Sequence, residues 1–148
     1  MSAWITLLAA VAGGAIAIAG QYVIGKSERT TRRAELVLDQ CAQLIALSED
    51  FRTRLWEERV LGQTDRTASW DIRAFRLAGA RLRILCGDQR VLAALDELKA
   101  SGKELGGYWR RGDIDADELD RRYERDKVAV EALAAASAQL VRRRLGAL

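Results

Sequence analysis

The sequence contains no proline and no histidine, and each absence excludes something specific. Without proline, no helix is broken by a residue that lacks an amide hydrogen and clashes with the preceding turn. Without histidine, there is no imidazole to act as the base of a serine hydrolase or as a ligand of a zinc or di-iron site. We therefore expect a protein that is not an enzyme, with no catalytic residues, metal or cofactor.

Cysteine is scarce as well. Cys41 and Cys86 are the only two in the chain, and both fall on apolar faces of predicted helices. In a cytoplasmic domain, two such thiols usually serve as small buried hydrophobic side chains. We predict that both are structural and form no disulfide or redox pair.

The chain also lacks a strong excess of charge, since 24 basic residues stand against 21 acidic ones and the net charge is only +3. Proteins that bind nucleic acids concentrate positive charge far more strongly. The basic residues of the last predicted helix alternate with acidic ones, which indicates i,i+4 pairing on a solvated face: Arg121, Arg122 and Arg125 alternate with Asp117, Asp120, Glu124 and Asp126. We predict no nucleic-acid partner.

One long apolar run is the most prominent feature that the sequence does contain. The 22 residues from Ala3 to Ile24 carry no charge. As a helix they would span about 33 Å, compared with about 30 Å for the hydrocarbon core of a bilayer. Trp4 and Tyr22 lie near the two ends, where amphipathic rings favour the headgroup region. The run predicts a transmembrane helix, with residues 1–25 as the anchor.

This run has two other interpretations, a cleaved signal peptide and a buried soluble helix. A signal peptide carries its positive charge before the apolar run. Here the charge follows it, in a basic juxtamembrane segment at 26–33 that contains Lys26, Arg29, Arg32 and Arg33. Because Lys and Arg are retained on the cytoplasmic side, we expect a single-pass protein with its N-terminus outside. The 20 arginines against 4 lysines favour a high-GC bacterium or its phage, and hence the bacterial inner membrane.

The predicted span is rich in small residues, with seven alanines and three glycines. Ala9, Gly13 and Ala17 recur every four positions, beside Ala10 and Gly14. Small residues at this spacing let two membrane helices approach closely. They predict a helix-association face, in a homo-oligomer or with a partner, although a GC-rich genome also spends alanine and glycine freely.

Residues 34–148 predict a cytoplasmic bundle, because four apolar stripes follow one another at helical spacing. The first stripe, from Val37 to Leu55, alternates steps of four and three as in a coiled coil, and we expect its helix to end near Gly62. Ser69 is the expected N-cap of the second helix, and Asp88 that of the third. Three glycines predict a kink or an early end in the third helix: Gly102, Gly106 and Gly107.

The last helix has the clearest start, a capping box with Asp115 as N-cap and Glu118 three residues later. Ile114 and Leu119 would add a hydrophobic staple across the same turn. Short connections favour antiparallel neighbours. The predicted fold is therefore all-α, a single N-terminal transmembrane helix followed by an antiparallel cytoplasmic bundle of about four helices.

This topology gives the bundle two different ends. The C-terminal arginines would lie near the membrane, where anionic lipid attracts them, or would simply face the helix dipole in solvent: Arg142, Arg143 and Arg144. At the opposite end gather residue types that are common in interaction hot spots: Trp56, Trp70, Tyr108, Trp109, Arg110 and Arg111. The same aromatic rings would also serve to plug the end of a small core.

At the level of class, these features predict a membrane-tethered adaptor or scaffold that binds another protein at the cytoplasmic face of the membrane. Two alternatives remain. One is an accessory subunit of a larger membrane complex. The other is a span-driven oligomer that forms a pore or lysis-type lesion, which is less favoured because the span offers no polar stripe to line a pore.

Overall fold

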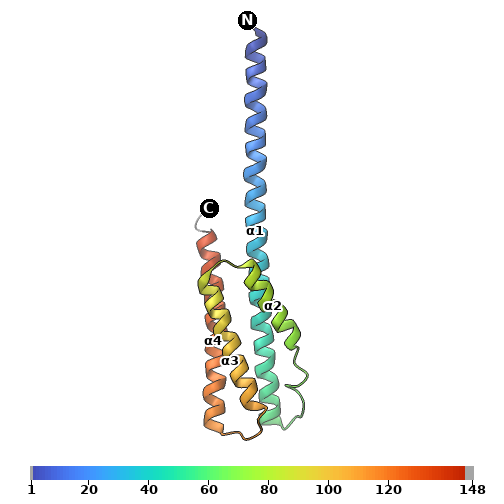
Figure 1. The fold of residues 1–148 in the computed structure, drawn as a ribbon, viewed down its shortest axis with the longest axis vertical. Helices are drawn as coiled ribbons and strands as arrows, with labels where there is room; N and C mark the ends of the chain where they lie inside the picture. Colours follow the sequence, from blue (N-terminus) through green and yellow to red (C-terminus); the bar gives the residue numbers. More distant parts are fainter. Residues whose placement is uncertain (1, 146–148) are drawn as a thin grey trace. The chain divides into compact units, whose positions relative to one another are not determined.

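The computed structural model describes the backbone of residues 2–145 and the side chains of residues 28–143. Four helices make up this part of the chain: α1 (Ser2–Leu61), α2 (Ile72–Leu85), α3 (Gln89–Trp109) and α4 (Ala116–Leu145) (Figure 1). Over the described residues the structure contains no strand, so the predicted all-α bundle is confirmed. The chain divides into two compact units, Met1–Glu35 and Leu36–Leu148, and the division falls inside α1.

Among the described residues, no helix is both long enough and apolar enough to cross a membrane. The structure therefore does not support the predicted transmembrane helix. The side chains of Ala3 to Ile24 lie outside the described residues, and so does the predicted association face of Ala9, Ala10, Gly13, Gly14 and Ala17. The span and its association face stay predictions.

The unit from Leu36 onward is an antiparallel helical bundle. Figure 1 shows the α2–α3 turn and the end of α4 at one end of it, with the α1–α2 loop and the α3–α4 turn at the other. All four helices contribute apolar residues to its larger core cluster, as their 3.6-residue spacing requires. Its largest fully buried members are Leu44, Leu82, Leu95, Leu98 and Leu133.

A second, smaller cluster fills the end of the bundle that carries the α1–α2 loop and the α3–α4 turn. It consists of Phe51, Leu55, Leu105, Tyr108 and Leu119. Four partly buried residues pack against it, namely Trp70, Trp109, Ile114 and Tyr123. We call this end of the molecule the aromatic end.

A buried polar layer separates the two clusters along the helices. Ser48 and Arg52 on α1, Ser101 on α3 and Asp126 on α4 are all buried. Asp126, which the sequence pattern placed on a solvated face, is only 2% exposed, so that prediction is wrong. Asp126 lies three residues after Tyr123 and four before Val130, which is the spacing of the buried stripe.

The charged face of α4 also pairs differently from the predicted pattern. Arg121 and Arg122 do pair with Glu118 within the helix. Arg125 instead reaches across to α3, where it binds Glu97 and Glu104. These cross-helix pairs link α3 to α4 at the surface, where solvent screens them.

The predicted helix starts are confirmed at two of three places. Asp88 caps α3 by accepting hydrogen bonds from the amides of Arg90 and Val91. Asp115 caps α4 through the amide of Glu118, at 2.8 Å. The prediction for α2 is wrong, because its N-cap is Asp71, whose carboxylate accepts from the Ala74 amide, and not Ser69.

The predicted early end of α3 is wrong, since the helix continues through Gly102, Gly106 and Gly107 to Trp109. The alternative, a kink at these glycines, stays a prediction. The reason for glycine at position 106 is packing. A Cβ there would lie 3.2 Å from Cζ of Phe51 on α1, closer than an ordinary van der Waals contact. Glycine allows α1 and α3 to approach, and the buried contact offsets the helix-propensity cost of about 1 kcal/mol.

The two cysteines behave as predicted. Cys41 on α1 and Cys86 at the end of α2 are both buried and free. Burial raises the pKa of the Cys41 thiol, because its effect is larger than the opposing effect of the hydrogen bond with Ser137. Both thiols therefore act as small apolar side chains of the larger core cluster.

Candidate functional site

The aromatic end is the candidate site, because it holds the six residues that the sequence indicated for partner binding. The structure brings three of them together, with Trp70, Tyr108 and Trp109 in one cluster. Trp56 is 47% exposed on α1. Arg110 and Arg111 are exposed in the turn that follows α3.

Trp70 serves mainly as a core residue. Its ring centroid lies 5.0 Å from that of Phe51 and 5.4 Å from that of Phe75, with tilted planes in both pairs. Its indole Nε1 donates a hydrogen bond of 2.8 Å to the carbonyl oxygen of Leu47. Both the ring and the polar atom of Trp70 are thus used inside the bundle, as buried tryptophans require.

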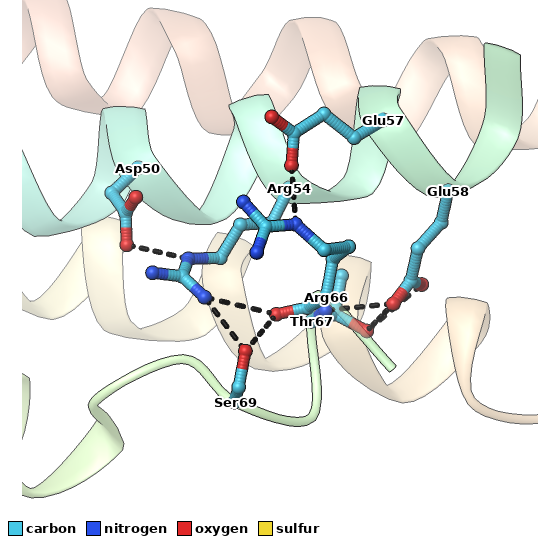
Figure 2. A network of polar contacts seen from close by, with 7 residues as sticks. All are labelled: Asp50, Arg54, Glu57, Glu58, Arg66, Thr67 and Ser69. Atoms are coloured by element: carbon cyan, nitrogen blue, oxygen red, sulfur yellow. Dashed lines mark hydrogen bonds and ion pairs between the residues drawn. The ribbon is translucent and has the colours of Figure 1, made fainter. Parts of the chain in front are cut away.

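A network of polar contacts holds the α1–α2 loop against α1 (Figure 2). Arg54 donates through Nε to Asp50, and through Nη1 to the Arg66 carbonyl oxygen and the Ser69 hydroxyl, at 3.2 and 2.7 Å. Arg66 in turn donates to Glu57 at 2.7 Å. The loop that precedes Trp70 is therefore fixed by charge-assisted hydrogen bonds rather than by apolar packing.

Glu58 connects three parts of the aromatic end. Its carboxylate accepts hydrogen bonds from the Thr67 amide and hydroxyl in the loop, and from the Trp109 indole on α3. Burial alone would raise the pKa of Glu58, but the hydrogen bonds from Thr67 and Trp109 outweigh it and lower the pKa. Trp109 is thus held in place by a side chain of α1.

Tyr108 closes the α3–α4 turn. Its hydroxyl accepts a hydrogen bond of 2.8 Å from the amide of Asp115 and donates a longer one, 3.4 Å, to the carbonyl oxygen of the same residue. The amide of Asp115 is the group that Glu118 would have bound in a full capping box, so only half of the predicted box forms. The guanidinium carbons of Arg111 and Arg122 lie 5.3 and 4.8 Å from the Tyr108 ring centroid, within cation–π range.

An open hollow of about 550 Å³ lies beside this tyrosine, between α3 and α4. Its charged lining consists of Lys103, Arg111 and Arg122 against Glu104 alone, with Ala100 and Gly107 completing it. Arg122 is already paired with Glu118 and Glu104, whereas Lys103 and Arg111 form no ion pair within the described part of the chain. The sequence reasoning named Arg111 for partner binding but not Lys103 or Arg122. Arg122 lies on α4, and its closeness to α3 appears only in the folded bundle.

The predicted membrane-surface residues occupy other positions. Arg29, Arg32, Arg33, Arg142 and Arg143 are exposed. Arg143 also binds Asp88 at 2.9 Å, so the end of α4 is tied to the α2–α3 turn. The side chains of Lys26 and Arg144 lie outside the described residues, and contact of any of these residues with lipid stays a prediction.

The buried polar layer is a second polar cluster that the sequence reasoning missed. Ser101 donates a 2.9 Å hydrogen bond to Asp126, and burial raises the pKa of that carboxyl. Arg52 pairs with Glu49, and its guanidinium carbon lies 5.8 Å from the Tyr123 ring centroid. Because Ser101 is 1% exposed, no substrate has access to it, and the cluster is part of the core.

Comparisons with known proteins give no further guidance. No family model, no curated protein and no solved structure matches this chain.

Proposed function

We propose that this chain is a membrane-tethered helical adaptor, which binds another protein at the cytoplasmic face of a bacterial inner membrane. The observation that carries the proposal is the uncharged run from Ala3 to Ile24, followed directly by Lys26, Arg29, Arg32 and Arg33. Such a run predicts a membrane span, and the basic residues after it favour a cytoplasmic position for the bundle.

The mechanism is confinement. A span would hold the bundle in two dimensions and raise its effective concentration toward partners at the same membrane. The aromatic end supports a binding role, because it presents the exposed Trp56 and the basic hollow around Arg111 on a rigid, hydrogen-bonded frame. Exposed Trp and Arg side chains on a fixed frame are typical of binding hot spots.

The test begins with location. The full-length protein, tagged at the C-terminus, should remain in the membrane fraction after carbonate washing, and the tag should be protected from protease in intact spheroplasts. Recovery in the soluble fraction, or a tag cleaved from outside, would contradict the proposal. A variant with Ala3 to Ile24 replaced by an unrelated apolar span should retain its function, because a tether requires only an anchor.

Partner binding is tested by mild-detergent purification from the native host, followed by mass spectrometry and sizing. We expect one defined set of proteins to co-purify with the chain. A fixed stoichiometry with a multi-subunit membrane assembly would instead assign it as an accessory subunit of that complex. A matched sample lacking residues 1–25 should recover less partner, because tethering is lost.

One observation favours a second candidate function, a span-driven oligomer. Ala9, Gly13 and Ala17 repeat at the spacing that allows close helix association in a bilayer. If this is the function, purification yields a homo-oligomer without a partner, and Gly13→Leu disperses it. Replacement of the span by an unrelated one would then abolish function, the opposite of the result expected for a tether.

A further inference from the structure

The outward face of α2 combines exposed apolar residues with arginines. Leu77 and Ile84 are 51% and 78% exposed, although α2 buries Ala78, Gly79 and Leu82 on its other side. Arg73, Arg76 and Arg81 are exposed on the same helix, and none of them forms an ion pair within the described part of the chain. A large apolar side chain that stays exposed is informative when it belongs to such a patch.

The spacing of these residues is that of a coiled-coil seam. Leu77, Ala80 and Ile84 follow one another at steps of three and four, as the a, d and a positions of a heptad do. The positions that flank this seam are all arginines, Arg76, Arg81 and Arg83. Arg83 is already paired with Asp96 of α3, so Arg76 and Arg81 remain for another binding partner.

The charges on this face of α2 indicate which kind of partner it binds. A second copy of α2 would bring a full set of arginines against another, which is repulsive at the flanking positions. A membrane surface is less suitable, because interfacial helices present a broad apolar face, whereas the outer face of α2 offers two large apolar side chains, Leu77 and Ile84, among arginines. A helix with acidic flanking positions satisfies both the apolar seam and the charges.

We infer that the outer face of α2 (Arg73, Arg76, Leu77, Ala80, Arg81 and Ile84) docks an acidic amphipathic helix of a partner protein. This inference rests on the proposed adaptor function and names the chemistry of the partner. The helix packs apolar residues between Leu77 and Ile84 over the small Ala80 and places Glu or Asp side chains beside Arg76 and Arg81. It thereby becomes a fifth helix of the bundle, in the groove-binding mode of amphipathic peptides.

The test uses the purified full-length chain in a mild neutral detergent and two synthetic three-heptad peptides. Both carry Leu at the a and d positions; one has Glu and the other Lys at the e and g positions, so that neither pairs with itself at neutral pH. Binding is followed by fluorescence anisotropy of labelled peptide. We expect the acidic peptide to bind and the basic one not to bind.

Three variants separate the parts of the site. The double substitution Arg76→Glu with Arg81→Glu should weaken binding of the acidic peptide about tenfold or more and create binding of the basic one. The double substitution Leu77→Ala with Ile84→Ala should weaken binding of the acidic peptide to a similar degree. The matched control, Arg90→Glu with Lys99→Glu on α3, makes the same change of net charge at exposed positions and should stay within about twofold of wild type.

Each contrary result overturns the inference. Equal losses in the control would show non-specific charge attraction, and an unaffected Leu77→Ala, Ile84→Ala variant would exclude the apolar seam. Absence of acidic-peptide binding, with binding instead to vesicles of anionic phosphatidylglycerol, would assign the face to a lipid surface.

Recovery of the native partner distinguishes a failure of this inference from a failure of the adaptor function on which it rests. If wild-type protein recovers a partner and the Arg76→Glu, Arg81→Glu variant recovers it equally well, the inference fails and the adaptor function stands. If wild-type protein recovers no partner, the adaptor function itself fails.

Discussion

The hydroxyl of Ser101 on α3 donates a hydrogen bond of 2.9 Å to the carboxylate of Asp126 on α4, at the level where the two apolar clusters meet. Both side chains are almost completely buried. Arg52 on α1 lowers the pKa of Asp126 through its charge, but burial has the larger effect and raises it. The bundle therefore contains an acid whose ionised form is disfavoured in the native state.

Asp126→Asn should stabilise the protein at neutral pH. With a raised native pKa, Asp126 holds its proton more tightly in the native state than in the unfolded chain. Stability therefore falls as pH rises from the ordinary pKa of the carboxyl through its native pKa. Asn keeps the acceptor for Ser101 and cannot ionise, so we expect a gain of about 1 kcal/mol in the free energy of unfolding by denaturant titration.

The gain from Asp126→Asn should shrink at pH values below the ordinary pKa, where the wild-type carboxyl is protonated in both states. Glu131→Gln, an exposed acid on the same helix, is the matched control and should change stability by less than about 0.5 kcal/mol. A destabilised Asp126→Asn variant at neutral pH would show that the charge attraction to Arg52 dominates.

Two adjacent glycines of α3 should respond oppositely to alanine. A Cβ at Gly107 meets nothing within 4 Å, so Gly107→Ala should stabilise the helix by about 0.5 to 1 kcal/mol. A Cβ at Gly106 would lie 3.2 Å from the Phe51 ring, so Gly106→Ala should lose that gain and destabilise the protein. Thermal unfolding followed by circular dichroism measures both, and equal gains would contradict the close approach of α1 and α3.

Glu58→Gln should loosen the aromatic end. The native pKa of Glu58 is lowered, so its contribution is fully present above the ordinary pKa and is lost as pH falls through the native value. At neutral pH we expect a loss of about 0.5 to 1 kcal/mol, because solvent screens this partly exposed carboxylate, together with faster amide exchange at Thr67. Variant and wild type should converge in acid. Glu57→Gln, which breaks only a surface pair with Arg66, should cost less.

The tryptophans should divide into one structural and one binding residue. Trp70→Ala removes a ring packed on Phe51 and Phe75 and should cost about 3 kcal/mol of stability. Trp56→Ala changes an exposed side chain and should leave stability within about 0.5 kcal/mol. Under the adaptor proposal it should nevertheless reduce the recovery of partner. An unchanged recovery would exclude Trp56 from the interface.

Local signals in the sequence predicted the helix ends well where one residue decides them. Asp88 and Asp115 are short acceptors placed directly before an apolar stripe, and both cap the expected helices. Ser69 failed because Asp71 lies closer to the first residue of α2 and its carboxylate is the better acceptor in that geometry. A choice between two neighbouring caps depends on the path of the loop, which the network around Arg54 determines.

Features that depend on contacts between distant residues could not be predicted from local sequence patterns. The packing reason for glycine at position 106 is Phe51, which lies 55 positions earlier in the sequence. Asp126 was predicted to be exposed because it is an acid among other charges, although its spacing matched the buried stripe. At this position the place on the helix, and not the residue type, determines burial. The Ser101 partner that makes its burial tolerable lies on another helix.

The Ser101–Asp126 hydrogen bond also favours one alignment of α3 and α4 along their length. If α4 slid by one turn, the Asp126 carboxylate would face Leu98 or Leu105 instead of the Ser101 hydroxyl. An acid buried there without a hydrogen bond would cost several kcal/mol, whereas the leucines and alanines on either side would tolerate the shift. One buried polar pair thus favours a single alignment of two long helices, whereas leucines and alanines alone would tolerate others.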